Sequence, residues 1–397
     1  MIRIGPESLG STRLLKEYGV KYAYLAGAMY KGIASKELVV ALGKAGFLGY
    51  LGTGGMARSE VESAIRYIQS ALDRGQGYGL NLLCNMERPE LEDEVVDLCL
   101  QYGVRFVEAA AFIQLTPSVV RYRLHGIRQN ERGEVVVPNR VLAKVSRPEV
   151  ARVFMEPAPA AIVDQLVAQG HLTPAQAQLS RQVPMAHEIC VEADSGGHTD
   201  QGVAYALMPA IFTLRDEVQR RFAYEKSILV GAAGGIGTPH AAAAAFAMGA
   251  DFVLTGSINQ CTVESGISDS AKDLLQTAGV NDTAYAPAGD MFELGAKVQV
   301  LKRGVFFLPG PTNCTSSTSG IGRWMTSTRK PVSSWKPSIS SDRSRMSGRK
   351  RGPITCEAIP PRLPMSSRIP GRRCCSSFAG ISFNPRAWPS RVSRISG

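Results

Sequence analysis

Residues 227–258 read SILVGAAGGIGTPHAAAAAFAMGADFVLTGSI, and this stretch contains the repeating unit of the chain. The run Ser227–Ala233 is short and apolar, which is typical of a buried strand. A glycine-rich turn follows and leads through Pro239 into an alanine-rich helical pattern that ends near Met248. A second apolar run, Asp251–Ile258, comes next. The order of strand, turn, helix and strand predicts a parallel β/α unit.

The same unit recurs along the chain. Strand-like runs occupy residues 21–29, 46–54, 77–83, 104–112, 139–145, 187–193, 227–233 and 251–258, with helical patterns between most of them. Eight strand–helix units in about 250 residues predict an α/β fold of the TIM (β/α)8 barrel type. A doubly wound open sheet is the alternative, because local periodicity does not encode strand order. Residues 113–138 and 146–186 exceed ordinary loops, and we expect insertions there, the second with two helical stretches.

Charge divides the chain into two unlike parts. The formal net charge is +11 over 397 residues, but 16 of the 45 Lys and Arg and only two of the 34 Asp and Glu lie in residues 308–397. Residues 1–307 therefore carry a net charge of −3. All three Trp and four of the eight Cys also lie after residue 307. We call residues 1–307 the body and residues 308–397, which are rich in Ser, Pro and Arg, the tail.

The body lacks the marks of several protein classes. No apolar run reaches the ~20 residues of a membrane-spanning helix, and the first residues lack the apolar segment of a signal peptide. Its four cysteines have neither CxxC nor metal-ligand spacing. Basic residues are concentrated in the tail, so the body shows no nucleic-acid signature. We therefore expect a cytoplasmic protein with no metal site, no membrane contact and no nucleic-acid partner.

Two glycine-rich turns predict a phosphate site. Residues 232–238 follow the seventh run, and Thr255-Gly256-Ser257 ends the eighth. Turns without side chains expose backbone N–H groups, and the helix start behind them adds partial positive charge. Barrels often bind a cofactor phosphate after strands seven and eight. The alternative is that these glycines only make tight turns.

Two side chains at strand ends are candidates for the chemistry. His198 follows Gly196-Gly197 at the end of the sixth run, where flexible glycines would let it approach a ligand and exchange a proton. A structural histidine is the alternative. Lys144 ends the fifth run and would serve at the barrel mouth as a charge partner for a phosphate or enolate. A lysine that extends along the surface is equally compatible with the pattern.

These motifs resemble a known family. Residues 26–29 (AGAM), 45–49 (AGFLG), 196–198 (GGH), 232–236 (AAGGI) and 255–257 (TGS) are similar to those of the FMN-dependent nitronate monooxygenase/FabK-type enoyl reductase superfamily. Within it, residues 24–36, 107–119, 189–201 and 251–270 most resemble the PfaD-type enoyl reductases, which act in trans in polyketide and polyunsaturated fatty acid synthases. The resemblance covers about residues 8–307.

The resemblance implies a barrel that holds FMN at its carboxyl face. It places the flavin ring along Ala26, Gly27, Ala28 and Met29, with Asn81 bonded to the ring and Gly197 close to it. We also count Lys144 with the cofactor-binding residues, as the charge partner for a phosphate or enolate described above. The phosphate would lie at Gly234, Gly235, Gly256 and Ser257, and His198 would lie over the ring as the catalytic residue.

The implied reaction is reduction of an α,β-unsaturated thioester carried by an acyl carrier protein, with NADPH or NADH as reductant. His198, or a water that it holds, is the candidate proton donor. Oxidation of nitroalkanes or nitronates by O₂ is the alternative activity. A non-enzymatic protein is the third possibility, either an inactive truncated barrel or a binding protein with a basic tail.

The tail is best interpreted as the product of a frameshift, with no packed native domain. Its alternative is a disordered Ser/Pro/Arg-rich segment. Joining the last base of each codon to the first two of the next permits, with suitable third bases, Phe307–Thr315 (FLPGPTNCT) to be read as Pro-Ala-Arg-Ala-Asn-Lys-Leu-Tyr, which continues the family pattern after Phe306-Phe307. Residues 318–336 and 377–388 also permit family-like sequences in that same frame.

The gene sequence tests this interpretation. We expect resequencing across the codons for Phe306–Thr315 to recover one missing base, because one lost base produces all three matches at once. Recovery would restore the family pattern beyond residue 307. A confirmed reading frame would instead contradict a sequencing error and leave a decayed gene copy.

Overall fold

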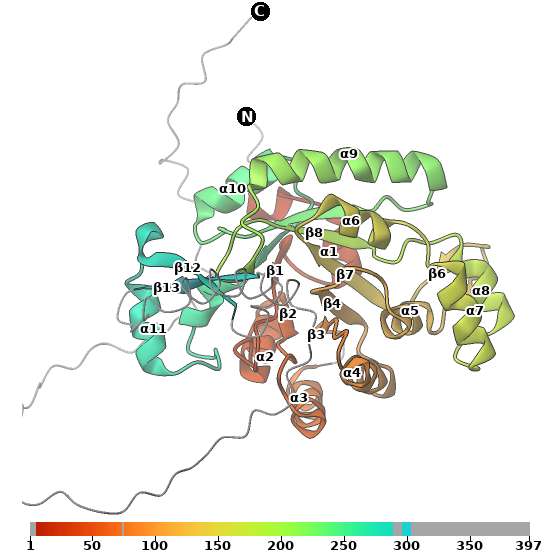
Figure 1. The fold of residues 1–397 in the computed structure, drawn as a ribbon, viewed down its shortest axis with the longest axis horizontal. Coiled ribbons are helices and arrows are strands. Elements are labelled where there is room, and N and C mark those ends of the chain that lie inside the picture. Colours follow the sequence, from red (N-terminus) through yellow and green to blue (C-terminus); the bar gives the residue numbers. More distant parts are fainter. Residues whose placement is uncertain (1–4, 74, 289–295, 303–397) are drawn as a thin grey trace, which may run out of the picture. The chain divides into compact units, whose positions relative to one another are not determined.

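The structure is a computed structural model that describes residues 5–73, 75–288 and 296–302. The tail and its frameshift interpretation lie outside the described residues. Among the described residues, eight parallel strands close into a barrel in the order β1-β11-β10-β8-β7-β4-β3-β2 (Figure 1). They are β1 (Tyr24–Ala26), β2 (Leu48–Leu51), β3 (Gly79–Leu83), β4 (Phe106–Ala110), β7 (Arg140–Val145), β8 (Glu188–Glu192), β10 (Leu229–Ala233) and β11 (Val253–Thr255).

The strands confirm the barrel prediction. Each of the eight predicted runs contains one of them, and β1 pairs with both β2 and β11. This double pairing closes the sheet, so the open-sheet alternative is wrong. Since all strands run parallel, their carboxyl ends gather at one mouth of the barrel.

Helices surround the strands. Each of the first seven barrel strands is followed by a helix: α2 (Lys36–Ala45), α3 (Arg58–Ala71), α4 (Pro89–Gln101), α5 (Pro117–Leu124), α6 (Pro148–Met155), α9 (Ala204–Phe222) and α10 (Pro239–Ala247). The short η1 (Pro6–Ser8) and α1 (Thr12–Tyr18) precede β1. Side-chain caps mark several helix starts, and Thr238 Oγ1 accepts a hydrogen bond from Ala241 N at the start of α10.

Alternating residues of the strands build two apolar layers. Leu25, Leu142 and Cys190 belong to a cluster enclosed by the barrel. Their neighbours Ala143 and Ile189 belong to the larger cluster between strands and helices. Because both faces of a parallel sheet are buried in this way, the strands read as nearly continuous apolar runs.

The two predicted insertions contain more secondary structure than expected. Residues 113–138 hold α5 and a small hairpin of β5 (Arg128–Gln129) and β6 (Val135–Val136). Residues 146–186 hold three helices, α6, α7 (Ala160–Ala168) and α8 (Pro174–Ser180), so the expectation of two was wrong. The third, α8, is only seven residues long, and a capping box at Thr173 and Gln176 supports it.

After β11 the chain does not return to the barrel wall with another helix in the described residues. It forms η2 (Ser257–Cys261), α11 (Asp269–Gln276), η3 (Val280–Asp282), β12 (Thr283–Pro287) and β13 (Lys297–Leu301). β13 pairs antiparallel with β12 and with β9 (Gly197–Thr199), which follows β8. This three-stranded sheet lies at one end of the molecule in Figure 1, opposite α7 and α8.

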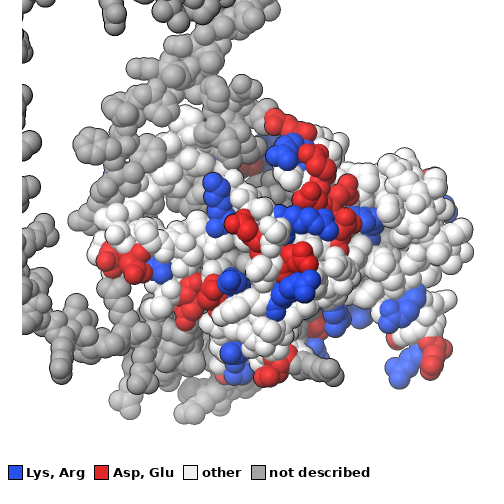
Figure 2. Space-filling view, turned by 90° about the horizontal axis from the view of Figure 1, so that it is seen from below, with Lys and Arg blue, Asp and Glu red and all other residues white. Residues whose placement is uncertain are grey.

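Charge on the described surface is mixed. On the face drawn in Figure 2, acidic and basic side chains are interspersed. This agrees with the small net charge of the body. None of the described helices has both the length and the apolar character needed to cross a membrane.

Candidate active site at the barrel mouth

The loop after β1 is held from two sides at the barrel mouth. Gly27 N donates to Thr255 O of β11 at 2.8 Å, and Ala28 N donates to Glu108 Oε2 of β4 at 2.9 Å. A Cβ on Gly27 would lie 2.5 Å from the Leu254 side chain, so only glycine fits there without displacement. The predicted flavin-binding residues 26–29 therefore form a fixed backbone ledge.

Lys144 lies inside the barrel and not along the outer surface. Its Nζ is 3.2 Å from Glu192 Oε1 and 3.7 Å from Glu108 Oε1, and its side chain is 20% exposed. Glu108 itself is fully buried. Lys144 therefore does not extend along the outer surface, and its role as a charge partner for a phosphate or enolate stays a prediction.

The pKa values of Glu108 and Lys144 depend on burial and on the charged groups beside them. Burial raises the pKa of Glu108, while Lys144 and the Ala28 amide oppose that rise. Burial works against the charge on Lys144, but Glu192 and Glu108 outweigh it and raise the lysine pKa above its ordinary value. Lys144 consequently stays protonated at neutral pH, since two carboxylates stabilise its charge.

Asn81 adds a fixed amide beside this cluster. Its Nδ2 donates to Glu108 O at 3.1 Å, and Thr53 Oγ1 donates to Asn81 O at 2.7 Å. Asn81 is the middle residue of β3 (Gly79–Leu83), and its side chain is buried. Its contact with the ring stays a prediction.

The two glycine turns after β10 and β11 form an open cradle. Gly234 and Gly235 have positive φ angles of 88° and 69°, and a Cβ on Gly234 would lie 2.4 Å from Ala193 O. Cβ atoms built on Gly235, Gly237 or Gly256 would meet nothing within 4 Å. Within the described ranges, the N–H groups of Gly235, Ile236, Gly256 and Ser257 donate no hydrogen bond. Unused donors beside open space suit an anion.

His198 lies in strand β9 and is exposed. Its backbone pairs with Val298 of β13, and Gly197 takes a φ of 91° with open space at its Cα. Gly197, the second glycine of the expected flexible segment, therefore begins a strand of a small sheet, because β13, which is far along the chain, supplies the pairing partner.

Asp194 ties this sheet to the end of β8. Its carboxylate accepts hydrogen bonds from Thr199 Oγ1 at 2.8 Å, from Gln299 Nε2 at 3.1 Å and from the Tyr285 hydroxyl. We did not single out Asp194, Glu108 or Glu192 from the sequence. For Glu108 a signal exists, because it is a lone carboxylate inside the apolar run VRFVEAAAF.

The donor groups at the mouth fit a flavin mononucleotide. An open, glycine-lined cradle with unused N–H groups matches a phosphate. Beside the ledge of residues 26–29, the side-chain amide of Asn81 and the ammonium of Lys144 offer hydrogen-bonding groups for a polar ring. In the part of the chain that the structure describes, no group of three or more His, Cys, Asp or Glu side chains is arranged to hold a metal ion.

A family model described as nitronate monooxygenase matches residues 11–293, which is more than half of the chain. The chain belongs to the nitronate monooxygenase family. The match spans every barrel strand and both glycine turns, so the fold and the cradle lie within the family's own extent.

Curated relatives of this family member are two polyketide biosynthesis proteins and proteins of a polyunsaturated fatty acid synthase. The polyketide biosynthesis protein PksE of Bacillus subtilis is 59% identical over 304 residues, which are 77% of this chain and 40% of PksE. ThaF of Burkholderia thailandensis is 54% identical over 301 residues, 76% of this chain and 26% of ThaF. A polyunsaturated fatty acid synthase protein of Thraustochytrium is 46% identical over 301 residues, 75% of this chain and 20% of that protein. The chain spans less than half the length of these relatives.

Two solved structures are similar to this chain. The enoyl reductase domain of MlnA from Bacillus amyloliquefaciens is 42% identical, with a TM-score of 0.76 over 80% of this chain and 71% of that one. FabK from Thermotoga maritima is 20% identical, with a TM-score of 0.53 over 82% of this chain and 81% of that one, and supports the fold alone. The resemblance inferred from the motifs is confirmed.

Replacing Lys144 tests the buried cluster. We expect Lys144→Met to lower the free energy of unfolding at pH 8 by about 3 kcal/mol, because Glu108 then stays buried without its cation. The raised pKa of Glu108 means that this loss grows as pH rises through the folded-state pKa and shrinks below the ordinary carboxyl pKa. Urea unfolding at pH 8 and pH 4 measures both values.

Lys16→Met is the matched control, because Lys16 is an exposed lysine in the last turn of α1. It should leave the urea midpoint unchanged at either pH. An equal loss for Lys144→Met at both pH values would contradict the role of the Glu108 charge.

Proposed function

We propose that the protein is an FMN-dependent enoyl reductase that reduces α,β-unsaturated acyl thioesters. The observation that carries this proposal is the likeness to the MlnA enoyl reductase domain, at 42% identity and a TM-score of 0.76. The relatives PksE, ThaF and the polyunsaturated fatty acid synthase protein support the same class of substrate.

The residues proposed to hold FMN fall into two groups. Ala26, Gly27, Ala28, Met29, Asn81, Lys144 and Gly197 would take the ring, and Gly234, Gly235, Gly256 and Ser257 would take the phosphate. When bound, FMN supplies hydride transfer from a nicotinamide to the β-carbon of the enoyl group. NADPH is our proposed reductant, and NADH is compatible with the same site.

The chain's own side chains have distinct tasks in this proposal. Lys144 presents a positive charge, held by Glu108 and Glu192, toward groups that become negative. His198, or a water that it holds, donates a proton to the α-carbon of the thioester. The sheet of β9, β12 and β13 sets the backbone position of His198.

An acyl carrier protein is the proposed partner, because the relatives belong to synthases that build acyl chains. The substrate would then reach the mouth as a thioester on a phosphopantetheine arm. We also propose a cytoplasmic location, since Cys84, Cys99, Cys190 and Cys261 are free thiols in the described part of the chain.

Nitronate monooxygenase activity is the second candidate, and the family model favours it. There His198 would act as a base toward a nitroalkane, with O₂ as oxidant. The two candidates differ in their need for a reduced nicotinamide. Anaerobic assays therefore separate them cleanly.

We expect the purified protein to oxidise NADPH anaerobically only when a crotonyl thioester is present. His198→Ala should lower kcat by about 100-fold or more, because it removes the proton donor. Stopped-flow absorbance at 340 nm measures this rate. His171→Ala is the control and should retain full activity, since His171 is exposed in the turn after α7.

Two results would contradict the first candidate. Nitronate-dependent O₂ uptake without NADPH would favour the monooxygenase activity, and a soluble protein without a flavin spectrum would support the inactive barrel. Full activity of His198→Ala would remove His198 as proton donor while leaving the reductase proposal in place.

Ser257 tests the phosphate cradle independently of turnover. Ser257→Asp should abolish the flavin absorbance of the purified protein, because the new carboxylate repels a phosphate at the same N–H groups. The fold should tolerate it, since an acidic residue at the first position of η2 is favourable. Ser257→Asn has the same shape without the charge and should retain flavin. Equal flavin content in both variants would place the phosphate elsewhere.

A further inference from the structure

His198 lies in a loop that leaves the end of β8 and returns to it. Asp194 N, two residues after β8, donates a hydrogen bond to Gly202 O at 2.8 Å, and this backbone contact closes residues 194–202 into a loop. β9, the strand that contains His198, lies within this loop. Among the described residues, β9 pairs with β13 and with no barrel strand. The position of His198 therefore depends on what fastens the loop to the three-stranded sheet of β9, β12 and β13.

The Asp194 carboxylate contacts all three strands of this sheet. Oδ1 accepts a hydrogen bond from Thr199 Oγ1 of β9 at 2.8 Å. Oδ2 accepts one from Gln299 Nε2 of β13 at 3.1 Å and another from the hydroxyl of Tyr285 in β12. Hydrogen bonds to a carboxylate are roughly twice as strong as those between neutral groups. A single side chain thus connects the end of β8 with β9, β12 and β13.

The same carboxylate contacts a neighbour of His198 on each strand of the β9–β13 pair. His198 pairs with Val298 of β13. Thr199 follows His198 in the chain, Gln299 follows Val298, and both donate to Asp194. A slip of this pair by one residue would turn Gln299 to the other face of the sheet and break its bond to Asp194. The carboxylate therefore favours the one register that places His198 beside Val298.

We propose that Asp194 is a positioning residue for His198: by fixing the register of β9 against β13, its carboxylate sets where the imidazole delivers a proton. This inference rests on the proposed function, in which His198, or a water that it holds, protonates the α-carbon of the thioester. Asp194 acts through Thr199 and Gln299 and has no proton transfer of its own. In the described part of the chain its side-chain hydrogen bonds all go to the small sheet, so its loss should leave the barrel folded.

Hydrogen–deuterium exchange measures this hold without cofactor or substrate. In Asp194→Ala, we expect the peptide that contains residues 197–199 to exchange about tenfold faster than in the unmodified chain, because the β9–β13 pair opens more often. A peptide from α5 should exchange at an unchanged rate. Asp194→Asn is the conservative variant and should restore most of the protection. Its amide oxygen can accept from Gln299 and Tyr285, and its N–H can donate to the Thr199 hydroxyl.

Turnover tests whether this hold serves His198. Asp194→Ala should lower kcat for crotonyl thioester reduction by about tenfold, because a misplaced donor slows proton transfer. Bleaching of the flavin absorbance by NADPH alone should keep its rate, since that step takes no proton from His198. In the His198→Ala background, Asp194→Ala should cause no further loss of kcat. Asp164→Asn is the control and should match the unmodified chain in every assay, because Asp164 is exposed on α7.

A second variant removes the same contact from the side of β13. Gln299→Leu leaves Asp194 in place and so guards against a variant at residue 194 that fails to fold. We expect it to speed exchange of residues 197–199 and to lower kcat only where His198 is present.

Two outcomes would overturn the proposal. Unchanged exchange of residues 197–199 in Asp194→Ala would show that β9 keeps its position without the carboxylate. An equal loss of kcat with and without His198 would show that Asp194 does not act through His198. An unmodified chain that fails to reduce the crotonyl thioester would instead defeat the proposed function, and the exchange rates would still decide whether Asp194 holds β9.

Discussion

Closure of the barrel through β1 and β11 is the constraint on which the rest of this structure depends. Tyr24, Leu25 and Ala26 pair with Val253, Leu254 and Thr255, and the bond from Gly27 N to Thr255 O extends this ladder by one residue. Closure brings the loop after the first strand beside the two glycine turns that lie more than 200 residues later. The predicted ring-binding and phosphate-binding segments lie at the same mouth of the barrel because these two strands meet.

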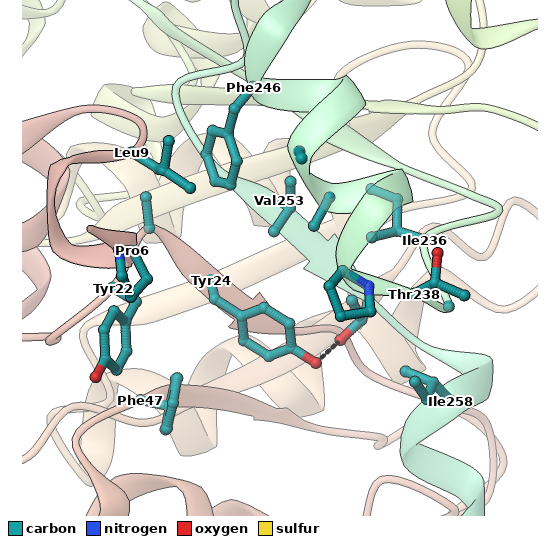
Figure 3. A pocket seen from close by; sticks show the side chains of 16 residues that line it. Pro6, Leu9, Tyr22, Tyr24, Phe47, Ile236, Thr238, Phe246, Val253 and Ile258 are labelled. Carbon is teal, nitrogen blue, oxygen red and sulfur yellow. Dashed lines mark hydrogen bonds between the residues drawn. The ribbon is translucent and has the colours of Figure 1, made fainter. Parts of the chain in front are cut away.

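The same closure creates a second surface on the outside. Residues alternate across a strand, so the side chains of β1 and β11 that do not point into the barrel must be covered from outside. Tyr24 and Val253 line an open apolar groove there. Among the described residues, this groove extends to Ile236 and Thr238, which belong to the turn of the predicted phosphate cradle (Figure 3). The outer groove and the predicted phosphate cradle are therefore neighbouring regions of the molecule.

The charged cluster inside the barrel mouth depends on the carboxylate of Glu108, which the sequence motifs did not reveal. Glu108 is fully buried and connects the backbone of Ala28 with the ammonium of Lys144. A buried charge persists only with a partner, so Glu108 and Lys144 stabilise each other, and Glu108 also holds the β1 loop through the Ala28 amide. From the sequence, a position of the Lys144 side chain on the outer surface was as compatible with the pattern as one inside the barrel. The local pattern does not show in which direction a long side chain at the end of a strand extends.

The sequence by itself determined the eight strands, the helices between most of them, the two glycine turns and the family, because apolar periodicity, glycine placement and motifs are local properties of the chain. Only the tertiary structure decided the closure of the sheet, the inward direction of Lys144, the pairing of β9 with β13 around His198 and the groove at the β1–β11 junction. Each of these depends on contact between segments far apart in the sequence. Such contacts follow from the geometry of closing a twisted parallel sheet, and no local pattern encodes that geometry.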